Sequence, residues 1–339
     1  MDASDVRRRG LQCARHIATQ REHPLATPCR WSARCLGSPS QGFTSGGAVS
    51  RQYASKNATQ LRLDIRKEFD DNRARYGAPR LYKAMCEHHG YTGSVNRIQM
   101  LMRAMGLRAK AGRKFKVTTD SAHQLPVAAN LLGQNFSCDP SPESSSHAKA
   151  PNQVWLSDIT YLWTREGWLY VCAVLDLFTR RIVGWAMAEH MTRGLVLDAL
   201  QMANSARKPS PGLIFHSDRG SQYASEQVRA WLTARAMRQS MSGTGNCYDN
   251  APMESFWHSM KVEETHGQDF ATRAAAKHCV FGYIEGWYNT TRMHSSLGYQ
   301  SPTQFERARD ATLREAANDD PTTIQSNCSQ SARLNKRAA

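Results

Sequence analysis

A block of three strand-like segments with very little chain between them constrains the fold of this sequence more than any other feature. The segments are VWLSDITYLWT, GWLYVCAVLDLFT and RRIVGWAMAEH, all rich in Val, Trp, Tyr and Ile. Segments of this composition with short breaks predict a meander of antiparallel strands. Helix-like and strand-like segments then alternate, in the order TRGLVLDALQMANSAR, GLIFHSD, SEQVRAWLTARAM, RQSM and a long helix that begins near Asn250.

The order of these elements is therefore strand, strand, strand, helix, strand, helix, strand, helix. This order is expected of an α/β domain of the ribonuclease-H-like class, in which helices flank a mixed sheet. We predict such a core over residues 151–310, with further helices at its C-terminal end.

Three acidic residues stand in unusual places within this core. Asp158 interrupts the first strand, Asp218 closes the run LIFHSDRG, and Glu254 lies in the last helix, with 35 residues between Asp218 and Glu254. Strand alternation puts Asp158 on one face with Leu156 and Thr160, and the ends of central strands are where sites gather. If the two strands are neighbours, both Asp side chains point to one place, and a helix crossing nearby can add Glu254.

Such a group of carboxylates predicts a metal site. Buried carboxylates repel one another and lose hydration, so they need cations, and a divalent metal ion is the usual one. Oxygen ligands without a neighbouring Cys or His cluster favour Mg²⁺ or Mn²⁺ over zinc. Two ions about 3.5–4 Å apart suit in-line displacement at phosphorus, so a phosphodiester substrate is expected. The predicted catalytic and metal-binding residues are Asp158, Asp218 and Glu254.

Other polar residues near this group are weaker candidates. Lys261 lies seven residues after Glu254, about 10.5 Å further along the same helix face, which is too far for an ion pair. It could hold a DNA phosphate beside the scissile bond, or be a solvated surface lysine. His258, one turn from Glu254, is a predicted DNA contact that could instead pack against the protein. Asp176 ends a strand and could line the site, whereas Asp249 is better explained as a helix cap.

Positive charge is concentrated in one part of the chain. The net charge is +15, and residues 51–116 contain 16 Lys and Arg against 5 Asp and Glu, whereas residues 151–310 contain 16 against 15. A compact basic segment joined to a nearly neutral one predicts a polyanion-binding module attached to a separate working domain, with nucleic acid as the expected polyanion. A purely solubilising role is the alternative, although solubilising charge is usually mixed in sign.

The basic segment has the pattern of three short helices, LRLDIRKEFDDN, APRLYKAMCEHHG and SVNRIQMLMRAMG. The third has Ser94 as its expected N-cap, Gly106 as its C-cap and one apolar stripe. We predict a helix-turn-helix-like DNA-binding domain over residues 56–116, with an ordinary three-helix bundle as the alternative. The outward polar side chains of the third helix that could reach DNA are Asn96, Arg97, Gln99 and Arg103. The basic arm that follows could contact phosphates through Arg108, Lys110, Arg113, Lys114 and Lys116.

The rest of the chain shows no regular period. Residues 1–55 are predicted to be irregular or disordered, residues 117–150 to be a linker, and residues 311–339 to be a disordered tail. The nine cysteines occur singly, without a CxxC pair, so neither a disulfide framework nor a zinc module is expected. Apolar stretches are far shorter than the roughly 18 residues of a membrane span, and no signal peptide is visible. A cytoplasmic protein without membrane contact is expected.

Motifs from about Ile65 to Glu306 resemble one protein family. They are YGAPRLYKAM, MRAMGLRAK, ANLLGQNF, WLSDITYL, EGWLYVCAVLDLFTRRIVGWA, HSDRGSQYAS, SMSGTGNCYDNAPMESFWHSMKVE and WYNTTRMHSSLGYQSPTQFE. The sequence is similar to bacterial insertion-sequence transposases of the IS-three type, specifically their second reading frame (OrfB), which have a retroviral-integrase-like catalytic core. Two departures are a first stretch of 55 residues that barely resembles the family and an inserted PSPESSSHAKAP, which lengthens the linker.

The resemblance implies a DNA transposase that cuts at the terminal repeats of its element and joins the freed 3′ hydroxyl to another phosphodiester, using Mg²⁺. It places the family's acidic triad on Asp158, Asp218 and Glu254, and its basic residue on Lys261. It also implies a homo-multimer on paired double-stranded DNA ends, and a first-frame (OrfA-type) partner protein, since no heptad zipper is visible here. Two other functions stay open: a nuclease without strand transfer, and a DNA-binding regulator with an inactive catalytic domain.

Overall fold

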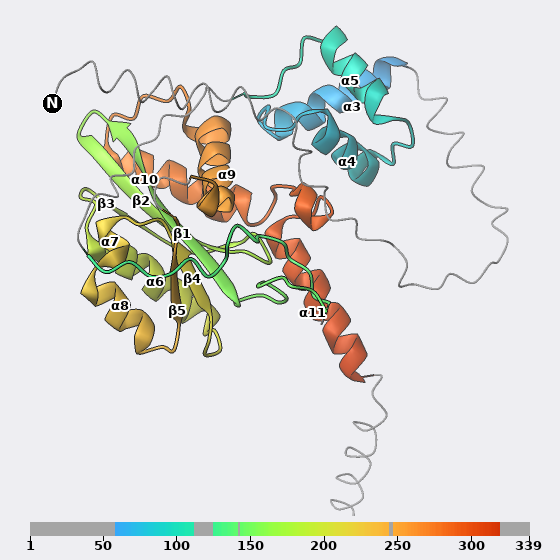
Figure 1. Ribbon diagram of the computed structural model, residues 1–339. Helices are drawn as coiled ribbons and strands as arrows, with labels where there is room; N and C mark the ends of the chain where they lie inside the picture. Colours follow the sequence, from blue (N-terminus) through green and yellow to red (C-terminus); the bar gives the residue numbers. More distant parts are fainter. Residues whose placement is uncertain (1–57, 112–124, 142, 244–246, 319–339) are drawn as a thin grey trace, which may run out of the picture. The chain divides into compact units, whose positions relative to one another are not determined.

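A mixed five-stranded sheet forms the centre of the core. The computed structural model describes residues 58–111, 125–141, 143–243 and 247–318. The strands are β1 (Val154–Thr164), β2 (Gly167–Asp176), β3 (Ile182–Ala188), β4 (Ile214–Ser217) and β5 (Arg238–Met241). Their order across the sheet is β3-β2-β1-β4-β5 (Figure 1). The first three strands are antiparallel neighbours, while β4 is parallel to β1 and β5 is parallel to β4. The predicted meander and the predicted mixed sheet are both confirmed.

The first hairpin is closed by local sequence. Strands β1 and β2 are joined by a turn at Arg165 and Glu166, and Gly167 follows with φ +108. Glycine adopts this backbone region without the steric penalty of a β-carbon. Beside the turn, the rings of Trp163 and Trp168 pack edge to face, with their centroids 4.8 Å apart. This contact stabilises the pairing of the two strands.

Helices cover both faces of the sheet. Those of the core are α6 (Arg193–Arg207), α7 (Ser221–Ala224), α8 (Glu226–Thr233), α9 (Ala251–Met260), α10 (Arg273–Phe281) and α11 (Pro302–Asn318). Shorter 3-10 or π-helical turns are η1 (Cys247–Asn250), η2 (Lys261–Thr265), η3 (Gly282–Tyr288) and η4 (Ser295–Leu297). The predicted order of strands and helices is confirmed, but the last predicted helix is not uniform, because α9 passes into the π-helical turn η2 at Lys261.

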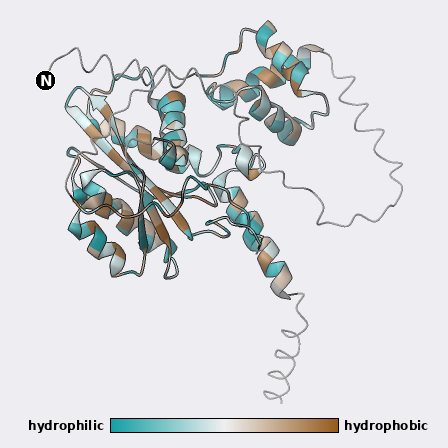
Figure 2. Ribbon diagram, in the orientation of Figure 1, coloured by the Kyte–Doolittle hydropathy of each residue, from teal (hydrophilic) through white to brown (hydrophobic). Residues whose placement is uncertain are grey.

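Alternation along each strand sorts side chains into two apolar layers. In β2, Val171 and Ala173 pack in the layer that contains α9 and α10, whereas Cys172 packs in the layer that contains α6 and α8. Figure 2 shows brown, apolar residues along the strands and teal, polar residues on outer helix surfaces. In β1, Leu156 belongs to the layer of α9. Asp158, two residues further along the strand, therefore points toward α9.

The segment before the core is held against it. In the described part of this segment, the Leu131 N–H donates to the Ser240 hydroxyl at 2.9 Å, and Leu132 is buried. The Met241 N–H donates to the Ala129 carbonyl at 3.4 Å. The segment thus lies along β5, which is the edge strand, and protects backbone groups that an exposed edge would leave unpaired.

The C-terminal prediction needs a correction. An irregular tail was expected from residue 311, but helix α11 continues to Asn318. The physical reason is local, because the stretch DATLREAAN contains Ala, Leu, Arg and Glu, which are strong helix formers. The predictions for residues 1–55, 117–124 and 319–339 lie outside the described residues. None of the described helices is both long and apolar enough to cross a bilayer.

Three short helices form the basic N-terminal domain, as predicted. They are α3 (Ala58–Asp71), α4 (Ala78–His89) and α5 (Val95–Ala104). The Ser94 hydroxyl accepts a hydrogen bond from the Arg97 N–H at 3.3 Å, which confirms the predicted N-cap of α5. Gly106, beyond the last turn, has φ +67. The next N–H, that of Leu107, donates to the Met102 carbonyl at 2.8 Å, which ends the helix.

Candidate active site

Asp158 on β1 and Asp218, the residue directly after β4, occupy equivalent positions relative to two neighbouring parallel strands. The register of β1 and β4 places Ser157 opposite Ser217, and the next residue along each chain is an Asp. Neighbouring strands are roughly 4.8 Å apart. The prediction required these two strands to be neighbours, and they are. Both carboxylates therefore emerge together at the carboxyl end of β4.

The negative charges of Asp158 and Asp218 repel each other. Burial raises the pKa of Asp158 well above its usual value, and repulsion from Asp218 adds the next largest rise. The Ile159 N–H, 2.8 Å from the Asp158 carboxylate, partly offsets this, and Glu254 adds a weaker repulsion. The Asp218 carboxylate accepts a hydrogen bond from the Gly220 N–H at 2.9 Å. A cation placed between the two carboxylates would relieve their repulsion.

Helix α9 is tied to the strand that carries Asp158. The Asn250 side-chain amide donates to the carbonyl of Ser157 at 3.1 Å, and both groups are buried. Glu254 follows one helical turn later, and its side chain is exposed to solvent. The neighbouring protein still removes part of its hydration, which raises its pKa. Asn250 is thus a positioning residue that the sequence did not reveal, although it directly precedes the helix that carries Glu254.

Lys261 is the first residue of η2 and lies close to the strand that carries Asp158. Its ammonium nitrogen lies 5.6 Å from the centre of the Tyr161 ring. Burial lowers the pKa of Lys261, while the negative charge of Asp158 raises it in part. The lysine is therefore near enough to Asp158 for the two charges to interact, which helical spacing from Glu254 alone did not predict. Tyr161 is a second neighbour that the sequence analysis missed; its aromatic ring on the Asp158 strand was the available signal.

The donor set fits a hard divalent cation. Asp158, Asp218 and Glu254 offer only oxygen atoms, which Mg²⁺ and Mn²⁺ prefer. Among the described residues, no three Asp, Glu, His or Cys side chains are grouped closely enough to hold an ion as they stand. The structure brings Asp158 and Asp218 together, whereas Glu254 is only near enough to raise the pKa of Asp158.

Comparison with known proteins identifies the family of the chain. A family profile described as "HTH-like domain" matches residues 56–115, and two described as "Integrase core domain" match residues 148–247 and 254–309. Transposase InsF for insertion sequence IS3A of Escherichia coli (strain K12) is 48% identical over 238 residues, which are 70% of this chain and 79% of InsF. The chain belongs to the IS3-type insertion-sequence transposases. The predicted family is confirmed, as is a ribonuclease-H-like core with a helix-turn-helix-like domain.

Further relatives of this IS3-type transposase are known. The insertion element IS600 uncharacterized 31 kDa protein of Shigella sonnei is 44% identical over 246 residues, covering 73% of this chain and 86% of the relative. Among solved structures, the HTLV-2 integrase catalytic core domain in complex with magnesium is 13% identical, with a TM-score of 0.35, over 46% of this chain and 96% of that chain. A simian T-cell lymphotropic virus intasome chain is 15% identical, with a TM-score of 0.37, over 66% and 69%.

Asp176 of the transposase has a structural role. It lies opposite Trp155 in the sheet, three residues before Asp158 along β1. Its buried carboxylate accepts hydrogen bonds from the Thr179 N–H at 2.8 Å and from the Asn152 N–H at 2.5 Å. The first bond holds the turn that follows β2, and the second ties the end of β2 to the segment before β1, so Asp176 has a structural role away from the carboxylate site.

Asp249 is not the helix cap that the sequence suggested, since Asn250 occupies that position. The Asp249 carboxylate instead accepts hydrogen bonds from the side-chain amides of Asn130, at 3.0 Å, and Gln134, at 2.7 Å. Its carbonyl lies 2.8 Å from Nε2 of His216. Asp249 thus joins the segment before the core to β4 and to the start of α9.

His216 makes the stability of this junction depend on pH. Burial lowers the pKa of His216 to about 4, against about 6.5 in an unfolded chain. The unfolded state therefore binds more protons between these values, so stability is full above pH 6.5 and falls as the pH drops toward 4, by about 3 kcal/mol. Urea unfolding of the wild type and of His216→Gln from pH 7.5 to 4 measures this. The variant, which lacks the titrating group, should lose less stability, and parallel profiles would contradict the prediction.

The predicted DNA contacts fall into three groups. Side chains of α5 and the following turn are exposed, namely Asn96, Arg97, Gln99, Arg103 and Arg108, and so is His258 on α9. Lys110 differs, because its ammonium donates to the Glu263 carbonyl at 2.7 Å and is engaged within the protein. Three members of the basic arm lie outside the described residues, namely Arg113, Lys114 and Lys116. Contact of any of these residues with DNA stays a prediction.

Proposed function

We propose that this transposase catalyses DNA transposition, by cleaving the 3′ ends of an insertion sequence and joining them to target DNA. The observation that carries the proposal is the pairing of β1 with β4 in a ribonuclease-H-like sheet, which brings Asp158 of β1 next to Asp218 at the end of β4. Two like charges placed together at the end of a central strand destabilise the free protein, which points to a bound cation during function.

Asp158, Asp218 and Glu254 would hold Mg²⁺ or Mn²⁺, as two ions. When bound, such ions lower the pKa of the attacking oxygen and neutralise the departing one. Asp158 and Asp218 supply the rigid side of the site, because each follows a paired strand residue. Asn250 anchors the helix that supplies Glu254. Lys261, beside Asp158, would hold the phosphate next to the scissile bond.

DNA recognition would be divided between domains. Residues 56–116 form the proposed DNA-binding domain, residues 117–150 the linker, and residues 151–310 the catalytic core. Residues 56–115 match a helix-turn-helix-like profile, and the exposed polar face of α5 supports entry into a major groove. A homo-multimer on paired ends, a first-frame partner protein and a cytoplasmic location belong to the same proposal.

Incubating the purified full chain with labelled double-stranded DNA tests the function. The DNA should carry the inverted repeats that flank the gene, with Mg²⁺ or Mn²⁺ in one arm and EDTA in the other. We expect end cleavage and a joined product only where metal is present. Cleavage without joining would favour the nuclease, and binding without cleavage would favour the regulator. Either result would overturn strand transfer as the activity.

A further inference from the structure

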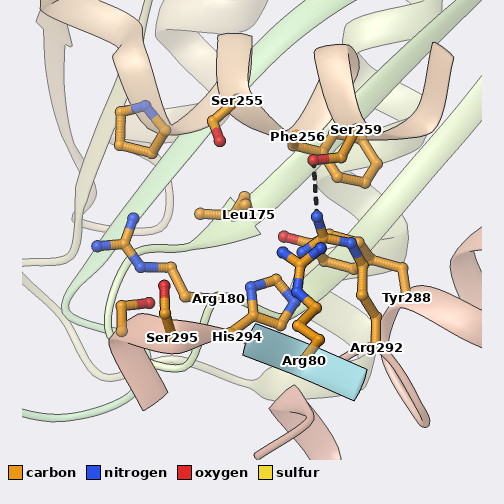
Figure 3. Close-up of a pocket in the computed structure, with 12 residues that line it drawn as sticks. Arg80, Leu175, Arg180, Ser255, Phe256, Ser259, Tyr288, Arg292, His294 and Ser295 are labelled. Carbon is orange, nitrogen blue, oxygen red and sulfur yellow. Dashed lines mark hydrogen bonds between the residues drawn. The ribbon is translucent and has the colours of Figure 1, made fainter. Parts of the chain in front are cut away.

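A polar cavity lies beside helix α9, and its lining contains none of the three carboxylates of the candidate active site. Its volume is about 230 Å³. Figure 3 shows side chains that meet there from α4, the turn after β2, α9 and the segment around η4. Its lining consists of Arg80, Leu175, Arg180, Pro252, Ser255, Phe256, Ser259, Tyr288, Arg292, His294, Ser295 and Ser296.

The lining is strongly cationic. It contains three guanidinium groups and, in the part of the chain that the structure describes, no carboxylate. One acid outside the lining, Glu263, lies 2.9 Å from Arg292 and 3.8 Å from Arg80, so these two share a single negative charge. Arg180 forms no ion pair with the described residues. The cavity therefore has an excess of positive charge that nothing in the described protein neutralises.

The backbone conformation of Arg180 is a further indication that this positive charge has a function. Its φ of +59 lies in the left-handed region, which is uncommon for a residue with a β-carbon. Asp176 holds the turn before it through the hydrogen bonds to Thr179. Residues in this conformation are enriched at ligand-binding sites, and here the conformation accompanies an arginine that lines the cavity.

His294 supplies an independent sign of a missing ligand. The residue is 8% exposed, and its Nε2 is buried without a hydrogen-bond partner among the described residues. Such orphaned polar atoms are costly and uncommon in native proteins. In Figure 3 the imidazole lies between Arg180 on one side and Arg292 on the other. An oxyanion in the cavity would accept a hydrogen bond from Nε2–H and would face the guanidinium groups at the same time.

The position of the cavity connects it with the carboxylate site. Ser255 and Ser259 are four residues apart, so they share one face of α9. Glu254, the residue before Ser255, lies about 100° around the same helix. The Ser259 hydroxyl accepts a hydrogen bond from Arg292 at 2.9 Å, while the Ser255 side chain is exposed at the cavity. Helix α9 thus carries both Glu254, a candidate metal ligand, and Ser255, which lines the cavity.

We propose that this cavity binds one phosphate group of the DNA backbone while another part of the same DNA occupies the carboxylate site. The inference rests on the proposed function for the identity of the polymer, but the anion site itself does not require catalysis. Arg180 is the main electrostatic contact, because it has no competing carboxylate, and His294 and Ser255 supply hydrogen bonds.

Two measurements on the full chain test the site without turnover. Inorganic phosphate is titrated against wild type and Arg180→Gln at constant ionic strength, and binding should weaken about tenfold in the variant, as loss of one charged hydrogen bond predicts. DNA affinity is then measured in EDTA over a range of salt concentrations. Loss of one phosphate contact should reduce the slope of log K against log salt by about 0.9. Arg238→Gln, which removes an exposed arginine of β5, is the matched control and should change neither quantity.

The outcomes separate this site from the proposed function. Loss of phosphate binding together with the smaller salt slope supports the proposal, even in a preparation that shows no strand transfer. Phosphate binding that depends on Arg180, with an unchanged DNA slope, would assign the cavity to a free ion and overturn the DNA contact. Equal behaviour of Arg180→Gln and wild type in both measurements would overturn the site altogether. Unfolding midpoints of the variants establish that each is folded.

Discussion

Asp218→Asn is expected to abolish both end cleavage and joining while leaving DNA binding intact. The substitution keeps the shape of the side chain and an oxygen that can accept the Gly220 N–H bond, but it removes the charge next to Asp158. Loss of a metal-binding carboxylate removes several kcal/mol of transition-state stabilisation, which corresponds to a rate lower by about three orders of magnitude. Gel analysis of labelled element ends with Mg²⁺ measures both steps, and a binding assay in EDTA measures affinity.

Asp198→Asn is the matched control for this experiment. Asp198 lies on the exposed side of α6, so the same chemical change there should leave cleavage, joining and binding unchanged. Joining by Asp218→Asn at a rate near that of the wild type would refute the assignment of the site. Loss of DNA binding by Asp218→Asn would instead indicate a folding defect, which the unfolding midpoint would reveal.

Local patterns predicted the individual strands well, because the composition and the alternation that mark a strand lie within a few neighbouring residues. The segment VWLSDITYLWT has the same bounds as β1. Its alternation correctly placed Asp158 on the face of Leu156, which packs in the layer of α9. The position of Asp218 at the end of β4 was equally visible, since Arg219 and Gly220 interrupt the apolar run.

The remaining features of the site depend on contacts between distant parts of the chain. Pairing of β1 with β4 is such a contact, and the sequence could offer it only as a condition. The bond from Asn250 to Ser157 spans 93 residues and has no local signature. The π-helical turn η2, which begins at Lys261, was not foreseen, because a continuous α-helix was assumed. Asp249 was interpreted as a helix cap because its hydrogen-bond partners, Asn130 and Gln134, lie 119 and 115 residues away and have no local signature.

Glu263, which the sequence analysis did not single out, is expected to be essential for stability. It lies in η2, two residues after Lys261, and is buried. Its carboxylate accepts hydrogen bonds from Tyr283 at 2.9 Å and from Trp287 at 3.2 Å, and forms a buried ion pair with Arg292 at 2.9 Å. Glu263→Gln would leave the Arg292 charge uncompensated, so the free energy of unfolding should fall by about 3 kcal/mol. Urea denaturation measures this loss.

A surface ion pair provides the control, because charge pairs in water contribute little. Arg165 and Asp269 are paired but exposed, so Asp269→Asn should lower the free energy of unfolding far less than Glu263→Gln does. The double variant Glu263→Gln, Arg292→Met should recover part of the loss, since it removes the unpaired charge together with its partner. If Glu263→Gln were no more harmful than Asp269→Asn, the buried pair would not be what holds η2. Lys261 would then need another anchor to stay beside Asp158.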